Sequence, residues 1–218
     1  MERSRPGGAG GDHRGTARRG ADCDGGGAGR GGWRPVSGYR SRGSEDRMKP
    51  WHLDPVPGYE PLVGRFVAML EDTRWRLFRD LEDFDPADLD RTPAGSPNSI
   101  GTLLYHVAAI ELDWLYADLL GGEFPDGTAQ WFPVDVREEG GRLTPVIDPW
   151  EHHLARLAWV RERLLEELRS FKDADLDRTF VSGADGNGGG WILHHLMQHE
   201  AEHRGQIGEI RAGIGTRH

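Results

Sequence analysis

Four long segments of this chain repeat their apolar residues at steps of three and four, which is the period of an amphipathic α-helix. Almost no stretch alternates apolar and polar residues as a strand does, so we expect an all-α protein. The helices are predicted over about 59–81, 97–120, 150–171 and 191–211. We expect them to form one antiparallel four-helix bundle, in which segment 123–148 makes a long crossover connection between helices 2 and 3.

Turn residues mark where these helices begin. Ser96 is the predicted N-cap of the second helix and Pro97 its first residue, because a serine hydroxyl can bind the exposed amides and proline has no amide hydrogen to leave unpaired. The glycine-rich segment 183–190 is expected to be a loop ahead of the fourth helix. It lacks the Lys-Ser/Thr pair of a phosphate-binding loop, so we exclude that function for it.

The first 47 residues differ in composition from the rest. They hold 14 of the 32 glycines and no Leu, Ile or Phe, so we expect residues 1–47 to be a disordered tail. Two interpretations stay open. In the first, the tail has no function, either because translation starts at Met48 or because the tail is inert. In the second, the tail is a basic arm that binds nucleic acid. Its basic residues are scattered, which favours the first. Residues 48–218 are the predicted helical domain.

Charge and cysteine content exclude several classes of protein. The net charge of −9 disfavours general nucleic-acid binding, which needs clustered Lys and Arg. The single cysteine, Cys23, excludes an intrachain disulfide and a thiolate metal cage. No run of eighteen apolar residues occurs, and no targeting segment is visible. We therefore expect a cytoplasmic protein that acts on a small molecule and binds neither membrane nor nucleic acid.

An internal repeat relates the two halves of the predicted domain. The segment 84–92 resembles 171–179, and GTLLYHVAAIE at 101–111 aligns with GWILHHLMQHE at 190–200. His106 then falls on His195, and Glu111 falls on Glu200. The repeat predicts two helix pairs related by pseudo-symmetry, with the two histidine-bearing helices facing each other.

The histidines of the fourth helix suggest a metal site. His195, His199 and His203 are four residues apart, so they share one helix face, which is also the apolar face. Two histidines at this spacing can bind one divalent ion, and His106 on the second helix is the natural third ligand. Three histidines with an open position are typical of a reactive metal rather than a structural one. Zinc, nickel, iron and manganese all remain candidates.

The alternative is that these histidines are ordinary core residues. A buried neutral imidazole needs a hydrogen-bond partner, and no Asn, Ser or Thr lies between the three, which favours the metal site. His194 is expected to point away from this face. His152 and His153, at the start of the third helix, are expected to be solvated.

The strings GTLLYHVAAIE and GWILHHLMQHEAEHRGQI resemble the DinB/YfiT-like family of metal-dependent enzymes over about residues 51–213. The resemblance implies a four-helix bundle and a metal held by one histidine of helix 2 and two of helix 4, here His106, His199 and His203. It also implies a low-molecular-weight thiol, such as bacillithiol or mycothiol, that the metal activates for transfer or isomerisation. Dimers are common in the family, so a homodimer is a further expectation.

His195 and Glu200 are the candidate catalytic residues, because either could accept a proton from the thiol. A second hypothesis is a zinc peptidase, since residues 199–203 read H-E-x-x-H with Glu200 as general base. Only 15 residues follow His203, and no strand is predicted to hold a peptide, so this hypothesis is disfavoured. A third is a non-enzymatic, metal-binding bundle with a role in stress response.

Overall fold

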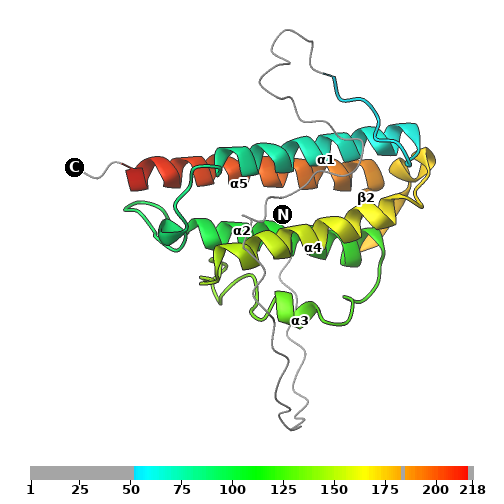
Figure 1. The fold of residues 1–218 in the computed structure, drawn as a ribbon. Coiled ribbons are helices and arrows are strands. Elements are labelled where there is room, and N and C mark those ends of the chain that lie inside the picture. Colours follow the sequence, from blue (N-terminus) through cyan, green and yellow to red (C-terminus); the bar gives the residue numbers. More distant parts are fainter. Residues whose placement is uncertain (1–51, 183–184, 216–218) are drawn as a thin grey trace, which may run out of the picture. The chain divides into compact units, whose positions relative to one another are not determined.

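The computed structural model describes residues 52–182 and 185–215, so the predicted tail over 1–47 and the start at Met48 lie outside the described residues. Helices dominate these residues, as predicted (Figure 1). The four long helices are α1 (Pro61–Asp80), α2 (Ile100–Asp113), α4 (Trp150–Leu168) and α5 (Gly189–Gly215). The shorter elements are η2 (Pro86–Asp88), the π-helical η3 (Trp114–Leu119), α3 (Thr128–Trp131), η4 (Asp173–Leu176), β1 (Thr179–Ser182) and β2 (Asp185–Gly188).

The start of α2 differs from the prediction. Ser99 is the N-cap, and its hydroxyl accepts a hydrogen bond from the Thr102 amide at 3.2 Å. Ser96 instead donates its hydroxyl hydrogen to the Asn98 carbonyl at 2.8 Å, so it closes the turn before the helix and Pro97 lies outside α2. Both serines are suitable N-cap residues, and Ser99 takes this role because its hydroxyl binds the amide three residues further on.

The glycine-rich segment ahead of α5 is partly strand rather than loop. Thr179–Ser182 and Asp185–Gly188 pair antiparallel, with Phe180 opposite Asn187. A Cβ on Gly189 would lie 2.5 Å from the Asp175 carbonyl oxygen, so only glycine allows α5 to begin this close to η4. The predicted connection 123–148 is likewise not featureless, because it contains α3.

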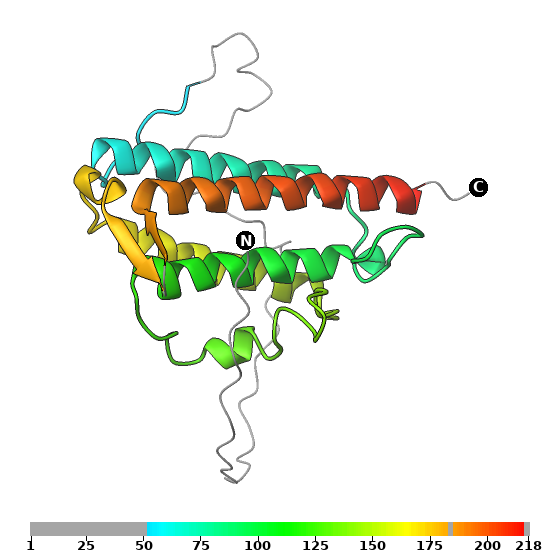
Figure 2. The ribbon, with the colours of Figure 1, turned by 180° about the vertical axis from the view of Figure 1, so that it is seen from behind.

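Helices α1 and α5 lie side by side and run in the same direction (Figures 1 and 2). Arg74 pairs with Glu200 and Asp80 pairs with Arg204, so residue numbers rise together along the two helices. The prediction of antiparallel neighbours therefore does not hold for this pair.

Helices α2 and α4 form a second side-by-side, parallel pair. Gly101 lies against His153 and Glu111 pairs with Arg161, which again aligns low numbers with low and high with high. The connection between η3 and α4 returns the chain to the end of the bundle at which α2 begins, and a short hairpin is not long enough to do so. Antiparallel packing does occur between α2 and α5, the two helices that carry the predicted metal ligands.

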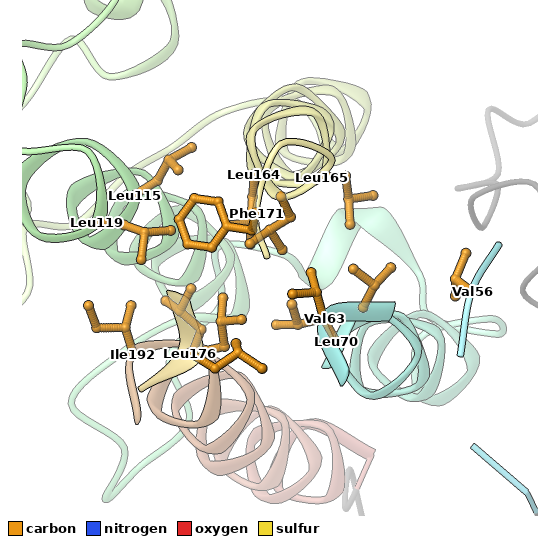
Figure 3. Close-up of a cluster of buried hydrophobic side chains, with 14 of the residues drawn as sticks. Val56, Val63, Leu70, Leu115, Leu119, Leu164, Leu165, Phe171, Leu176 and Ile192 are labelled. Carbon is orange, nitrogen blue, oxygen red and sulfur yellow. The ribbon is translucent and has the colours of Figure 1, made fainter. Parts of the chain in front are cut away.

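Apolar side chains from all four long helices fill the interior in two clusters. Figure 3 shows the first, in which leucines and other apolar residues of the four helices meet Phe171 and Leu176. The second is at the other end and is built mainly from buried residues of the four helices: Leu77, Ile100, Leu103, Leu104, Val107, Leu157, Val160, Ile207, Ile210 and Ile214. Each fully buried apolar side chain contributes about 1.5–3 kcal/mol, so these clusters hold the helices in place.

A buried network of five charged side chains separates the two clusters. Arg74 and Arg161 are 0% and 2% exposed, and Glu71, Glu111 and Glu200 are equally enclosed. Arg161 donates to Glu111 at 2.6 Å and to Glu200 at 3.0 Å, while Arg74 donates to the same two carboxylates. Burial alone would raise the pKa of Glu111, but the two arginines outweigh it and hold that pKa below its usual value.

This network follows the internal repeat. Arg74 donates to the Leu157 carbonyl at 3.0 Å, and Arg161 donates to the Leu70 carbonyl at 2.9 Å, so the two arginines make equivalent bonds across the interior. The two shared carboxylates are the pair that the repeat aligns. The predicted pseudo-symmetry is thus visible in the side chains that join the two helix pairs.

None of the described helices combines the length and the apolar composition needed to cross a membrane.

Candidate metal centre

Three histidines converge between α2 and α5. The Nε2 atom of His199 lies 3.1 Å from Nε2 of His106 and 3.0 Å from Nε2 of His203. One ligand atom of each residue lies within 4.8 Å of the others, and this is the one such group of three or more His, Cys, Asp or Glu among the described residues. The structure therefore brings together the three residues predicted as metal ligands.

Hydrogen bonding orients one of these rings. Nδ1 of His203 lies 3.0 Å from Oε1 of Gln206. An amide oxygen only accepts, so Nδ1 of His203 carries the hydrogen and its Nε2 directs a lone pair at the other two rings. Four residues separate His203 from His199, so both rings extend from the same face of α5 toward His106 on α2.

The spacing of the three nitrogens suits a divalent ion. Imidazole nitrogens at 2.0–2.1 Å from zinc are separated from one another by roughly 3.0–3.4 Å, depending on coordination geometry. The two separations from Nε2 of His199, 3.1 and 3.0 Å, lie at the short end of that range. All three ligand atoms lie within 4.8 Å of one another, so one ion could bind the three rings after small adjustments of the side chains.

Burial keeps the ligands in the form that binds metal. Loss of solvent, with a smaller contribution from the neighbouring His203, lowers the pKa of His106 to about 3 and that of His199 to about 2. Both rings are therefore neutral at pH 7, as metal ligation requires. The guanidinium of Arg137 also lowers both values, which places a positive charge near the centre that sequence reasoning missed.

The family comparison agrees with this geometry. The sequence model of the DinB superfamily matches residues 69–207, which is more than half of the chain and includes all three histidines. This chain belongs to the DinB superfamily. A solved structure, described as a conserved protein of locus from Enterococcus faecalis, superposes with a TM-score of 0.55 over 68% of this chain and 94% of that one. At 18% identity the likeness shows a shared fold. No curated protein matches the chain.

His195 of this DinB superfamily protein lies beside the centre but outside the group of three. Its ring stacks on Trp191, with centroids 5.2 Å apart, and contacts Trp114 at 4.7 Å. Its centroid is 6.1 Å from that of His199. The sequence repeat explains the position, because it aligns His195 with His106 while Ile110 and Trp114 stand where His199 and His203 stand in the other half.

Glu200 is directed away from the three histidines. It follows His199 and so lies about 100° further round the helix, inside the buried charge network. One carboxylate oxygen accepts from Arg74 and the other from Arg161. The sequence could have indicated this, since the repeat aligns Glu200 with Glu111, which follows no predicted ligand.

The remaining histidines of the described residues are outside the centre. His194 is exposed, as predicted, and His152 pairs with Asp148 at 3.3 Å. His153 was expected to be solvated, and that prediction is wrong: it is fully buried, and its Nδ1 accepts a hydrogen bond from Arg156 at 3.1 Å. It faces α2 at Gly101, where the absence of a side chain makes room for the ring.

Proposed function

We propose that this protein is a divalent-metal-dependent enzyme, a transferase or isomerase that uses a low-molecular-weight thiol of the bacillithiol or mycothiol type. The observation that carries the proposal is the convergence of three imidazoles, from His106, His199 and His203, on one point. Three protein ligands leave coordination positions open, which is typical of catalytic rather than structural sites. Membership of the DinB superfamily supports the same reading.

The donor set suits thiol chemistry. A divalent ion with three neutral ligands keeps its positive charge, so it would lower the pKa of a thiol that reaches it. The chain itself offers no sulfur nucleophile in residues 48–218, because its single cysteine is Cys23. The reactive sulfur must therefore come from a cosubstrate.

We assign His195 the role of accepting the proton that the thiol loses. It lies one helical turn from His199, and the indoles of Trp191 and Trp114 hold its ring in place. Glu200, the other candidate, has both oxygens bound to arginines, so we assign it a structural role. The same pairing disfavours the peptidase hypothesis, because an H-E-x-x-H glutamate must reach a water at the metal.

The proposal is tested with the cobalt-loaded protein, because cobalt reports ligand binding in its visible spectrum. Bacillithiol or mycothiol should change that spectrum, and the thiol should be consumed when a chloro-dinitrobenzene electrophile is added. His203→Ala should abolish both effects, whereas His194→Ala, at an exposed histidine of the same helix, should leave them intact. A protein that binds cobalt but gives no response to any thiol would be a metal-binding bundle without this activity, and the proposal would fail.

A further inference from the structure

Trp191, in the first turn of α5, packs one face of its indole ring inside the protein. That face stacks on His195, with an interplanar angle of 2° and ring centroids 5.2 Å apart. Trp114 contacts both rings, with its centroid 5.6 Å from that of Trp191 and 4.7 Å from that of His195. Trp191 is nevertheless 50% exposed. One side of a large, well-supported aromatic ring is therefore available to a ligand.

A cavity of about 350 Å³ lies beside this ring, with Trp191 as one wall. It is formed by α1, η4 and the start of α5, and its apolar lining comes from Leu62, Phe66, Met69 and Leu176. Gly190 also lines it, and a Cβ there would approach the Leu176 carbonyl oxygen to 3.3 Å. The volume lies in the range of small-molecule sites, so the cavity can hold an aromatic ring system.

Three charged side chains line the same cavity, and two of them have partners. Arg65 donates from Nη1 to the Leu53 carbonyl at 2.9 Å. Asp173 accepts from two amides in the first turn of α1, at 2.8 and 3.1 Å. Asp177 is exposed, and its carboxylate makes no hydrogen bond or ion pair within the part of the chain that the structure describes. The cavity thus combines an aromatic wall with an available carboxylate.

The internal repeat indicates that this lining is not a general property of the fold. It aligns Phe66 with His153, in the register that aligns the two arginines of the charge network. In the same register, Met69 corresponds to Arg156. His153 and Arg156 are both fully buried and lie 3.1 Å apart in a hydrogen bond. The apolar positions beside the cavity are therefore specific to this half of the molecule.

We propose that this cavity binds an aromatic amine. The ring of such a molecule would lie against the open side of the Trp191 indole, which attracts both aromatic rings and cations. Its ammonium group would pair with Asp177, whose carboxylate lines the same cavity. The stacked rings of Trp191 and His195 stand between the cavity and His199, so the site is separate from the three histidines and independent of the proposed thiol chemistry.

Three indoles with different tails test the proposal: tryptamine, indole and indole-3-acetate, which are cationic, neutral and anionic. Ligand-observed NMR titrations at constant ionic strength should give the tightest binding for tryptamine and the weakest for indole-3-acetate. Trp191→Leu should weaken all three by roughly tenfold, because each loses an aromatic partner. Trp75→Leu, at a partly buried tryptophan of α1 outside the cavity lining, is the control. Wild-type affinity in Trp191→Leu, or no binding of any indole, would overturn the proposal.

Asp177→Asn tests the role assigned to the amine. It should lower tryptamine affinity by about fivefold, to that of indole, and leave indole binding unchanged. Asp83→Asn, at an exposed aspartate outside the lining, should keep the preference for tryptamine. Leu62→Arg, at a position that is 53% exposed, adds a positive charge to the lining and should weaken tryptamine more than indole. An unchanged preference for tryptamine in Asp177→Asn would show that this carboxylate does not bind the amine.

Metal removal separates this site from the candidate metal centre. Tryptamine should bind equally to the metal-free and the cobalt-loaded protein, because the proposed contacts include none of the three histidines. Binding that requires the metal would place the indole in the metal centre, and the proposal of a separate site would fail. If tryptamine binds as expected while no thiol changes the cobalt spectrum, the thiol proposal fails and this site stands.

Discussion

At the scale of single residues, the candidate metal centre depends on how its three histidine rings are oriented as well as on where they lie. The hydrogen bond from His203 to Gln206 selects the tautomer whose Nε2 carries the lone pair that a metal ion would bind. No equivalent constraint could be read from the sequence, in which Gln206 is one polar residue near a helix end. The bond is a testable part of the centre.

Replacing Gln206 with Leu should therefore weaken metal affinity. Loss of a hydrogen-bond partner behind a histidine ligand lowers affinity by roughly 10–100-fold, while the bound stoichiometry at saturating metal stays the same. Competition with a chromophoric zinc chelator measures this change. Gln198→Leu, which removes an exposed glutamine of the same helix, is the control. Unchanged affinity in Gln206→Leu would show that the contact does not orient His203.

His153 gives the protein a predictable dependence on pH. Burial lowers its pKa to about 4, against about 6.5 when unfolded, so the unfolded chain binds more protons between these values. The contribution of His153 to the unfolding free energy is fully present above about pH 6.5 and is lost as the pH falls toward 4. Between pH 7.5 and 5.0, this residue should cost about 2 kcal/mol of unfolding free energy. Urea unfolding of His153→Asn should lose about that much less over the same interval, and identical losses would contradict the assignment.

At the scale of elements, the sequence predicts most of what its local pattern determines. Three of the four long helices lie within about four residues of their predicted bounds, and the second reaches its predicted end only through the π-helical η3 that follows α2, because apolar period and turn residues are local signals. The facing of His106 toward His199 and His203 was also predictable, since the spacing of four and the internal repeat both indicate it. The parallel direction of α1 and α5 and the position of the connection that carries Arg137 could not be predicted, because both depend on contacts between distant segments.

The two serines before α2 test how that helix begins. Ser99→Ala should lower the unfolding free energy by about 1 kcal/mol, because the Thr102 amide loses its capping partner. Ser96→Ala removes a hydroxyl only from the preceding turn, so its effect should be clearly smaller. Urea denaturation of both variants gives the comparison. A larger loss for Ser96→Ala would place the start of the helix where the sequence alone first suggested.

At the scale of the whole molecule, the buried charge network joins all four long helices at the level of the metal centre. Arg74 and Glu71 come from α1, Glu111 from α2, Arg161 from α4 and Glu200 from α5. Glu111 lies on the same helix as His106, and Glu200 directly follows His199. Because both glutamates pair with the same two arginines, the network holds α2 and α5 at the separation that the three histidines need. It accounts for the acidic residue after His199, because Glu200 pairs with both Arg74 and Arg161.

Glu200→Gln separates a structural role of this residue from a catalytic one. A neutral amide leaves two buried arginines short of a negative partner, and removing one member of such a pair costs about 3–5 kcal/mol of stability. We expect a matching fall in unfolding free energy, measured by urea denaturation, while the folded variant still binds one metal equivalent. Full stability with lost thiol turnover would instead assign Glu200 to catalysis. Glu202→Gln, at an exposed position two residues away, is the control.

The central claim is that His106, His199 and His203 hold one divalent ion, and metal analysis by mass spectrometry tests it most directly. Untagged wild-type protein, expressed with zinc, nickel and manganese supplied, should contain about one equivalent of metal. His203→Ala should contain little, and His194→Ala should match the wild type. Equally metal-free wild type and His203→Ala proteins would contradict the account, and the three rings would then be a buried histidine cluster in a DinB superfamily fold.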